Sequence, residues 1–302
     1  MRSFRRSARK VLANPLGFAL QVLKAFKANQ GLLLAGGVAY YTLLSIVPLL
    51  ILLVIVLSHV VDTEQLLATV ARYLQLVAPG QSGPIMDDMR AFVANRGVIG
   101  WTLAVTLVFF SSLAFTVLEN AMSVIFYHRV AIRRRHFVMS ALLPYLYILL
   151  LGIGLLVVTV VASALQNMAA ESILVDGHEW SLGRLSSVLL YLIGVVGEVL
   201  LLATIYLVMP VGRLSWRHAL VGGVAATVLW EISRHVLVWY FATLSQVRTV
   251  YGSLTTAIVV LLSLEIAAIV LLFGAQVIAE YERIGDEPIE KKPEGMRTPK
   301  AT

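Results

Sequence analysis

The chain has 302 residues, of which 59% are apolar and only 14% charged, and it carries a formal net charge of +7. Such a composition leaves too little polar surface for a water-soluble protein of this length, and it indicates a membrane protein. The chain contains no cysteine, which excludes disulfides, thiolate catalysis and cysteine metal sites.

Residues 1–31 are basic and are expected to form a cytoplasmic tail followed by an amphipathic helix. No uninterrupted apolar segment precedes Leu32, so we do not expect a cleaved signal peptide. Lys24 and Lys27 are interpreted as lying off an apolar stripe, and the pattern predicts a helix in the membrane interface. The stripe recurs at helical spacing and consists of Leu16, Ala19, Leu20, Leu23 and Phe26.

Six apolar stretches follow, and each is long enough to cross a hydrocarbon core of about 30 Å. They cover residues 32–61, 98–126, 137–165, 186–210, 218–244 and 253–279. We therefore expect an all-α integral membrane protein with a bundle of six transmembrane helices. A single membrane domain would cover residues 32–280, and residues 281–302 would form a disordered, cytoplasmic polar tail.

The connection between the first two spans is too long for a simple turn and is expected to be a helical extracytoplasmic loop. One apolar stripe ends at Pro79 and Gly80, and a second short helix is expected from Pro84 through Met86, Met89 and Phe92. Such helices can cap an outer vestibule or form a packed connection. We favour the packed connection, because amphipathic loops commonly cover apolar surface.

The distribution of positive charge predicts the orientation of the chain. The two terminal tails, the second connection and the fourth connection hold 18 of the 24 Lys and Arg residues. Cations in short flanking segments are retained on the cytoplasmic side, so both termini are expected to be cytoplasmic, in a bacterial inner membrane. We expect membrane lipids as partners, including anionic headgroups at the cytoplasmic face, and no nucleic acid.

Three carboxylates lie deep inside the predicted spans. Glu198, Glu231 and Glu265 each lie 12 or 13 residues from the start of their stretch, or about 18–20 Å at the rise of an α-helix. Arg234 and His235 follow Glu231 at i+3 and i+4, so the three side chains share one helix face and a Glu to Arg pair can form.

Two interpretations of these charges remain open. In the first, Glu198 and Glu265 line a polar pathway together with the cluster around Glu231 and carry protons or ions. In the second, the same groups form a polar lock between helices. Glu119 and Asn120 lie nearer the inner end of their span, where a side chain can reach the aqueous interface, so both interpretations have equal weight for them. Glu280 is expected to be interfacial.

Backbone irregularity gives a weaker signal in the first span. Pro48 frees a carbonyl one turn earlier and predicts a kink near residues 44–48. Tyr40, Tyr41 and Ser45 precede it, and the kink either presents hydroxyls to a cavity or only shapes packing. Four glycines are interpreted as close helix contacts: Gly36, Gly37, Gly222 and Gly223.

Enzyme signatures are missing from the sequence. There is no Gly-rich phosphate loop, no His-Glu-x-x-His helix and no Gly-x-Ser-x-Gly elbow. The six histidines are scattered without a second acidic ligand at metal-binding spacing. We therefore expect no catalytic residues, no cofactor and no metal site.

Several short motifs together resemble the BrkB/YihY family of bacterial inner-membrane proteins over most of the chain. They are Gly36-Gly37-Val38-Ala39-Tyr40-Tyr41 through Ser45-x-x-Pro48, Leu118-Glu119-Asn120-Ala121-Met122, Trp230-Glu231, Tyr251-Gly252-Ser253-Leu254 and Leu272-Phe273-Gly274-Ala275. The resemblance implies a six-span bundle, linked in some members to serum resistance or envelope integrity. An older family label, ribonuclease BN, finds no support in these residues.

Two positions depart from the family pattern. Gln276 stands where the family often has Glu, and Glu265 stands where an aromatic residue is expected. From the deep carboxylates, we expect an ion- or proton-coupled transporter or a lipid-handling protein that uses these midplane residues. The alternative is a structural or scaffold membrane protein that transports nothing, and a homo-oligomer is compatible with either function.

Overall fold

The computed structural model describes residues 2–57, 64, 67–71, 82–94, 101–126, 142, 145–147, 149–150, 153–154, 173–175, 178–180, 182–209, 214–243 and 254–286. The helices within these ranges are α1 (Arg2–Ala13), α2 (Pro15–Ala28), α3 (Gly31–Leu57), α5 (Ser82–Ala94), α6 (Trp101–Ile125), α8 (Leu182–Val208), α9 (Trp216–Thr243) and α11 (Leu254–Asp286).

Five helices of the described part, α3, α6, α8, α9 and α11, are long and apolar enough to cross a membrane. They correspond to five of the six predicted spans. The remaining predicted span, residues 137–165, lies largely outside the described residues. A short antiparallel ladder, β1 (Ile173–Val175) with β2 (His178–Trp180), precedes α8 and was not predicted. Three residues per strand are too few to give an alternating pattern in the sequence.

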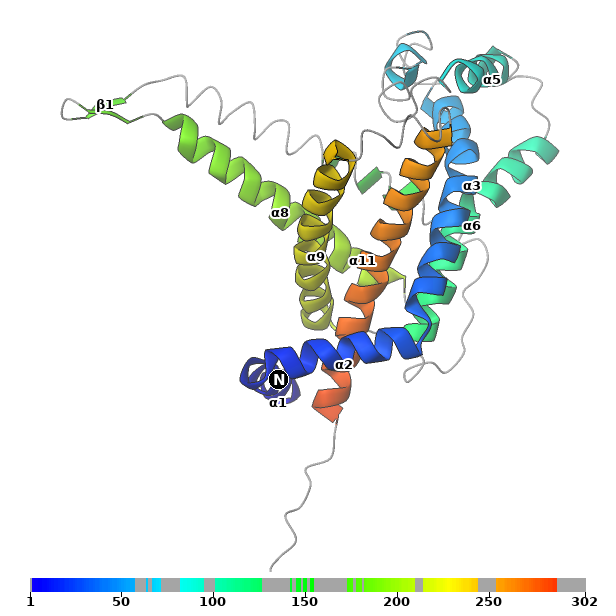
Figure 1. Ribbon diagram of the computed structural model, residues 1–302. Helices are drawn as coiled ribbons and strands as arrows, with labels where there is room; N and C mark the ends of the chain where they lie inside the picture. The colour runs from blue at the N-terminus through cyan, green and yellow to red at the C-terminus, as the bar shows by residue number, and fades with distance from the viewer. Residues whose placement is uncertain are drawn as a thin grey trace, which may run out of the picture.

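Among the described helices, α11 packs against the largest number of other helices. It packs against α1, α2, α3, α6 and α9, while α3 also packs on α6, and α8 packs on α9. Figure 1 shows α2 crossing one end of the upright helices, α5 near the opposite end, and α8 diverging from the bundle towards the β1–β2 ladder. Residues distant in sequence therefore meet along α11.

A two-residue turn joins α2 directly to α3. Asn14 begins α2, because its side-chain Oδ1 accepts a hydrogen bond from the Gly17 amide at 2.9 Å and Pro15 follows at the first helical position. At the other end the Asn29 amide donates to the Ala25 carbonyl, and Gln30 adopts a positive φ of 53°. This left-handed residue lets the chain turn from the crossing helix into the upright one.

Small residues set the closest helix contacts in the core. The Tyr206 hydroxyl on α8 is fully buried and donates to the Leu271 carbonyl on α11 at 2.8 Å. A Cβ added at Gly274 would collide with the Tyr206 hydroxyl. The predicted close contacts are confirmed at Gly222 and Gly223, where a Cβ would meet Ile278 and the Val199 carbonyl respectively.

The interpretation of Gly37 as a close contact was wrong, because no described atom beyond the α3 backbone and the neighbouring residues lies within 4 Å of a Cβ placed there. Neighbouring glycines in a helix point in directions about 100° apart, so only one of the pair Gly36 and Gly37 faces another helix. The sequence does not indicate which one does.

Met86 and Met89 on α5 are buried, as is Val93, and they pack against Ile51 and Val54 on α3. This contact agrees with a packed connection. Span six was predicted to end at residue 279, but α11 continues to Asp286 and its last turns are buried. The first residues of the predicted polar tail are therefore part of the helical core.

We expect Gly274→Ala to lower the free energy of unfolding by about 1–3 kcal/mol, because the added methyl group overpacks the contact with Tyr206. The measurement is thermal unfolding in detergent. Gly37→Ala is the matched control, since its methyl group meets open space, and we expect it to change stability by at most about 1 kcal/mol. Equal destabilisation by both variants would contradict the packing argument.

Candidate functional site

Charged residues of α9 form the predicted cluster on one helix face. Arg234 Nη2 donates to Glu231 Oε2 at 2.6 Å, and the two side chains are 50% and 20% exposed. His235 Nδ1 lies 2.7 Å from the Glu231 backbone carbonyl. The predicted pairing of Glu231 with Arg234 is therefore confirmed, with His235 beside it.

Glu198 on α8 lies within electrostatic range of this pair, although no hydrogen bond or ion pair among the described residues joins it to Glu231 or Arg234. It is partly buried and interacts electrostatically with both Glu231 and Arg234. We call Glu198, Glu231 and Arg234 the α8–α9 cluster. Counted as two carboxylates and one guanidinium, it carries a formal charge of −1. An open cavity of about 390 Å³ borders Arg234, and the described residues that line it are Arg234, His235, Val238 and Trp239.

Glu265 lies apart from this cluster, on α11 where that helix packs against α3. A Cβ placed on Gly36 would lie 3.9 Å from Glu265 Oε1. Gly36 therefore faces the carboxylate, and a methyl group there would meet it at an ordinary contact distance. Among the described residues, no hydrogen bond or ion pair joins Glu265 to Glu198 or Glu231. The three predicted carboxylates are therefore divided between two helix interfaces.

The hydroxyl-bearing residues of α3 contribute mainly to packing. Ser45 is 3% exposed, and its Oγ accepts a hydrogen bond from the Ala114 amide of α6 at 3.1 Å. Pro48 lies within α3, which continues beyond it. Tyr40 is exposed and its ring meets the edge of the partly buried Tyr41 ring. Burial of Ser45 favours the packing interpretation of this segment.

The two weaker candidates on α6 differ in exposure. Glu119 is partly buried, and its backbone carbonyl accepts a hydrogen bond from Ser123 Oγ at 2.8 Å. Asn120, the next residue, is exposed. Neither lies in the α8–α9 cluster.

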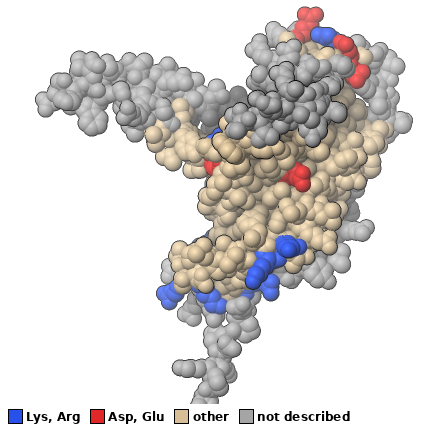
Figure 2. All heavy atoms as spheres, in the orientation of Figure 1, with Lys and Arg blue, Asp and Glu red and all other residues tan. Residues whose placement is uncertain are grey.

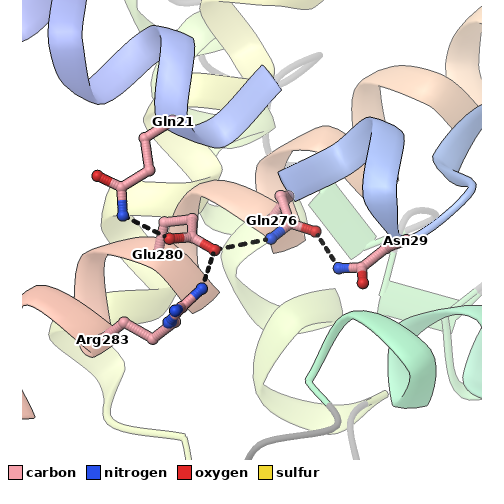
Figure 3. Close-up of polar contacts among 5 residues, drawn as sticks. All are labelled: Gln21, Asn29, Gln276, Glu280 and Arg283. Atoms are coloured by element: carbon pink, nitrogen blue, oxygen red, sulfur yellow. Dashed lines mark hydrogen bonds and ion pairs between the residues drawn. The ribbon is translucent and has the colours of Figure 1, made fainter. Parts of the chain in front are cut away.

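A second polar centre joins α2 to the last turns of α11 (Figure 3). Glu280 is 2% exposed and accepts hydrogen bonds from Gln21 Nε2 at 2.8 Å and Arg283 Nη1 at 3.2 Å. Gln276 Nε2 donates to the same carboxylate at 3.3 Å, while Gln276 Oε1 accepts from Asn29 Nδ2 at 2.9 Å. We call these five residues the α2–α11 network.

Glu280 was predicted to be interfacial, and the structure adds that its side chain is buried between α2 and α11. A carboxylate this deeply buried is costly unless hydrogen bonds compensate for the lost water, and here three donors do so. The α2–α11 network is thus a structural link that the apolar pattern alone did not reveal.

Gln276 needs both ends of its amide in this network. It accepts from Asn29 and donates to Glu280, and an ionised carboxylate can only accept. A glutamate at position 276 would place a second negative charge against Glu280. The local partners therefore account for the glutamine in this chain.

The end of α11 is also tied to the start of α9. His218 Nδ1 lies 3.1 Å from Glu282 Oε1, and Glu282 is 5% exposed. The His218 ring meets the Tyr281 ring edge-on at 5.7 Å. Polar contacts therefore hold the last turns of α11 on two sides.

Sequence reasoning named Gln276 but missed its partners Gln21, Asn29 and Arg283. One signal was available, because Gln276, Glu280 and Arg283 recur at i, i+4 and i+7 and so share one helix face. The partners on α2 gave no comparable signal, since only the crossing of the two helices brings them together.

We expect Gln276→Glu to lower the free energy of unfolding by about 1–3 kcal/mol, because it removes a donor to a buried carboxylate and adds a like charge. Thermal unfolding in detergent measures the effect. The exchange variant Gln276→Glu/Glu280→Gln restores one carboxylate and one amide to the pair, and we expect it to recover part of the loss. Unchanged stability in Gln276→Glu would contradict the assigned hydrogen bonds.

Comparison with known proteins agrees with the helical membrane architecture. The family described as "Virulence factor BrkB" matches residues 22–299. A UPF0761 membrane protein of Rhodospirillum centenum is 28% identical over 89% of this chain. Others, from Aliivibrio salmonicida and Haemophilus influenzae, are 26% and 23% identical over 81% and 89% of it.

The relatives differ in length. The chain spans 58% of the Rhodospirillum centenum protein, 76% of the one from Aliivibrio salmonicida and 97% of the one from Haemophilus influenzae. No solved structure matches the chain. Because the family match extends over nearly the whole chain, the protein belongs to the BrkB family of membrane proteins.

Proposed function

We propose that this protein is a multi-pass inner-membrane transporter, coupled to ions or protons or acting on lipids, whose polar path includes the α8–α9 cluster. The observation that carries the proposal is that Glu198 lies within electrostatic range of the Glu231–Arg234 pair, on two helices that are each long enough to span the membrane. Charged side chains within a bilayer are costly, and they commonly mark ion or substrate pathways.

The charge balance of the cluster suits a proton or a cation. Arg234 pairs directly with Glu231 at 2.6 Å, which leaves the charge of Glu198 without a full counter-charge in the α8–α9 cluster. Binding a proton or a cation would neutralise this remaining charge. The neighbouring cavity, lined by Arg234 and His235, offers a route by which water or substrate reaches the cluster.

Much of the α8 span faces outward from the described bundle. Only 6% of this span is buried, compared with 28% of the spans in α3, α6 and α11. One face of α8 packs closely on α9, where Gly223 approaches the Val199 carbonyl. A displacement of α8 relative to α9 would alter the surroundings of Glu198, as alternating access requires.

The orientation rests on the surface charge. Figure 2 shows Lys and Arg gathered at the end of the molecule where α1 and α2 lie, while acidic residues gather at the α5 end. Positive flanking residues favour the cytoplasmic side. We therefore assign the α1–α2 end, and with it both termini, to the cytoplasm.

A structural or scaffold role is the second candidate, and the α2–α11 network favours it. The buried Glu280 with its three donors is a charge whose contacts all serve helix packing, and it supports this candidate. The α8–α9 cluster could do the same. The two functions differ in whether water reaches Glu198.

We expect a cysteine at Glu198 to react with a membrane-impermeant thiol reagent, because the proposed path is filled with water. The natural chain has no cysteine, so the background is silent. Ala268→Cys is the matched control, since Ala268 is 4% exposed in the core and should be protected. Protection of position 198 in a folded protein would instead support a dry polar lock.

We expect Glu198→Gln to leave the unfolding midpoint close to that of the parent protein and to abolish flux, because Glu198 belongs to the proposed path. A pH-sensitive dye inside proteoliposomes measures proton flux under an imposed ion gradient. Asp87→Asn changes an exposed carboxylate on α5 and should retain flux. If Glu198→Gln loses stability while flux per folded molecule is retained, the scaffold role is favoured.

A further inference from the structure

The helices α1 and α2 leave a row of leucines exposed at one end of the bundle. Leu16, Leu20 and Leu23 on α2 are 78%, 57% and 55% exposed, and Leu12 at the end of α1 is 80% exposed. The three leucines of α2 are spaced at i, i+4 and i+7 and therefore share one helix face. We call them the leucine row.

A different face of α2 holds the helix on the bundle. Val22 and Phe26 are buried, and the Phe26 ring meets the Phe273 ring of α11 edge-on at 5.5 Å. The α2–α11 network adds hydrogen bonds from Gln21 and Asn29. The predicted apolar stripe is thus divided, because Phe26 faces the bundle while the leucine row points away from it.

Positive charge lies next to the leucine row. Lys24 and Lys27 are exposed and follow Leu20 and Leu23 by one helical turn. They therefore continue the leucine row. The sequence had been interpreted as placing both lysines off the apolar stripe. Arg9 on α1 is exposed as well. Long cationic side chains beside exposed leucines are typical of a helix at the boundary between acyl chains and anionic headgroups.

The exposed apolar surface continues from α2 onto a candidate membrane span. Leu32 and Leu33, at the start of α3, are 63% and 71% exposed. They belong to the span Gly31–Ile55, and only the turn at Asn29 and Gln30 separates them from α2. An occupant that covers the outside of the α3 span can therefore cover the leucine row without a break.

We infer that α2 is a docking surface for the anionic phospholipids of the adjacent leaflet, with the leucine row in the acyl-chain boundary and Lys24 and Lys27 at the headgroup phosphates. This inference does not depend on transport. Because the α2–α11 network fixes α2 to α11, the lipid contact also sets the depth of the bundle in the membrane.

The test measures the depth of single nitroxide labels on the full chain in vesicles. Labels are attached at Leu20→Cys, Lys24→Cys and Val22→Cys, with phosphatidylcholine vesicles that contain or lack phosphatidylglycerol. Collisions with oxygen report the acyl region, and collisions with a water-soluble nickel chelate report water. Thermal unfolding of each labelled variant establishes that it is folded.

We expect the label at position 20 to favour oxygen over the nickel chelate several-fold more strongly than the label at position 24. The label at position 22 serves as the buried control and should meet neither reagent, because Val22 is 1% exposed. Nickel access at position 20 would overturn the inference by placing the leucine row in water. Protection of position 20 from both reagents would overturn it in favour of a protein partner, such as a second copy.

The charge contribution is tested in the same vesicles. We expect phosphatidylglycerol to raise the ratio of oxygen collisions to nickel-chelate collisions for the label at position 20. We expect the added changes Lys24→Gln and Lys27→Gln to remove that increase. Equal values with and without phosphatidylglycerol in the parent chain would overturn the assignment of anionic headgroups.

Discussion

The burial of polar groups at the end of α11 is the constraint on which the arrangement of the helices depends. Glu280 is 2% exposed, so its carboxylate requires donors, and Gln21 of α2 provides one. Glu282 makes the corresponding link to His218 of α9. Since a buried charge without partners costs several kcal/mol, these contacts hold the crossing helix α2 and the first turns of α9 in fixed positions around α11.

The family motifs acquire physical reasons from this arrangement. Gly274 has no side chain because the Tyr206 hydroxyl occupies that space and bonds the Leu271 carbonyl. Gly36 faces the Glu265 carboxylate, which a Cβ there would meet at an ordinary contact distance of 3.9 Å. At Gly274 a glycine on one helix accommodates a polar atom from the next, a recurrent solution where helix backbones approach closely.

The two polar centres of the molecule differ in how fully their charges are compensated. The α2–α11 network surrounds one carboxylate with three donors, which favours a fixed structure. The α8–α9 cluster has two carboxylates, one guanidinium and a bordering cavity, on the least buried of the described spans. The charges of the α8–α9 cluster are therefore compensated less completely than the carboxylate of the α2–α11 network.

The sequence by itself determined the membrane class, five spans that the structure describes and the pairing of Glu231 with Arg234, because hydropathy and i, i+3 spacing are local properties of a helix. Only the tertiary structure decided that Glu265 faces Gly36, that Gly37 meets open space and that Glu280 is buried. Each of these depends on which way a helix is rotated and what crosses it. Nearly uniform apolar spans carry little information about rotation, since lipid and protein neighbours accept the same side chains.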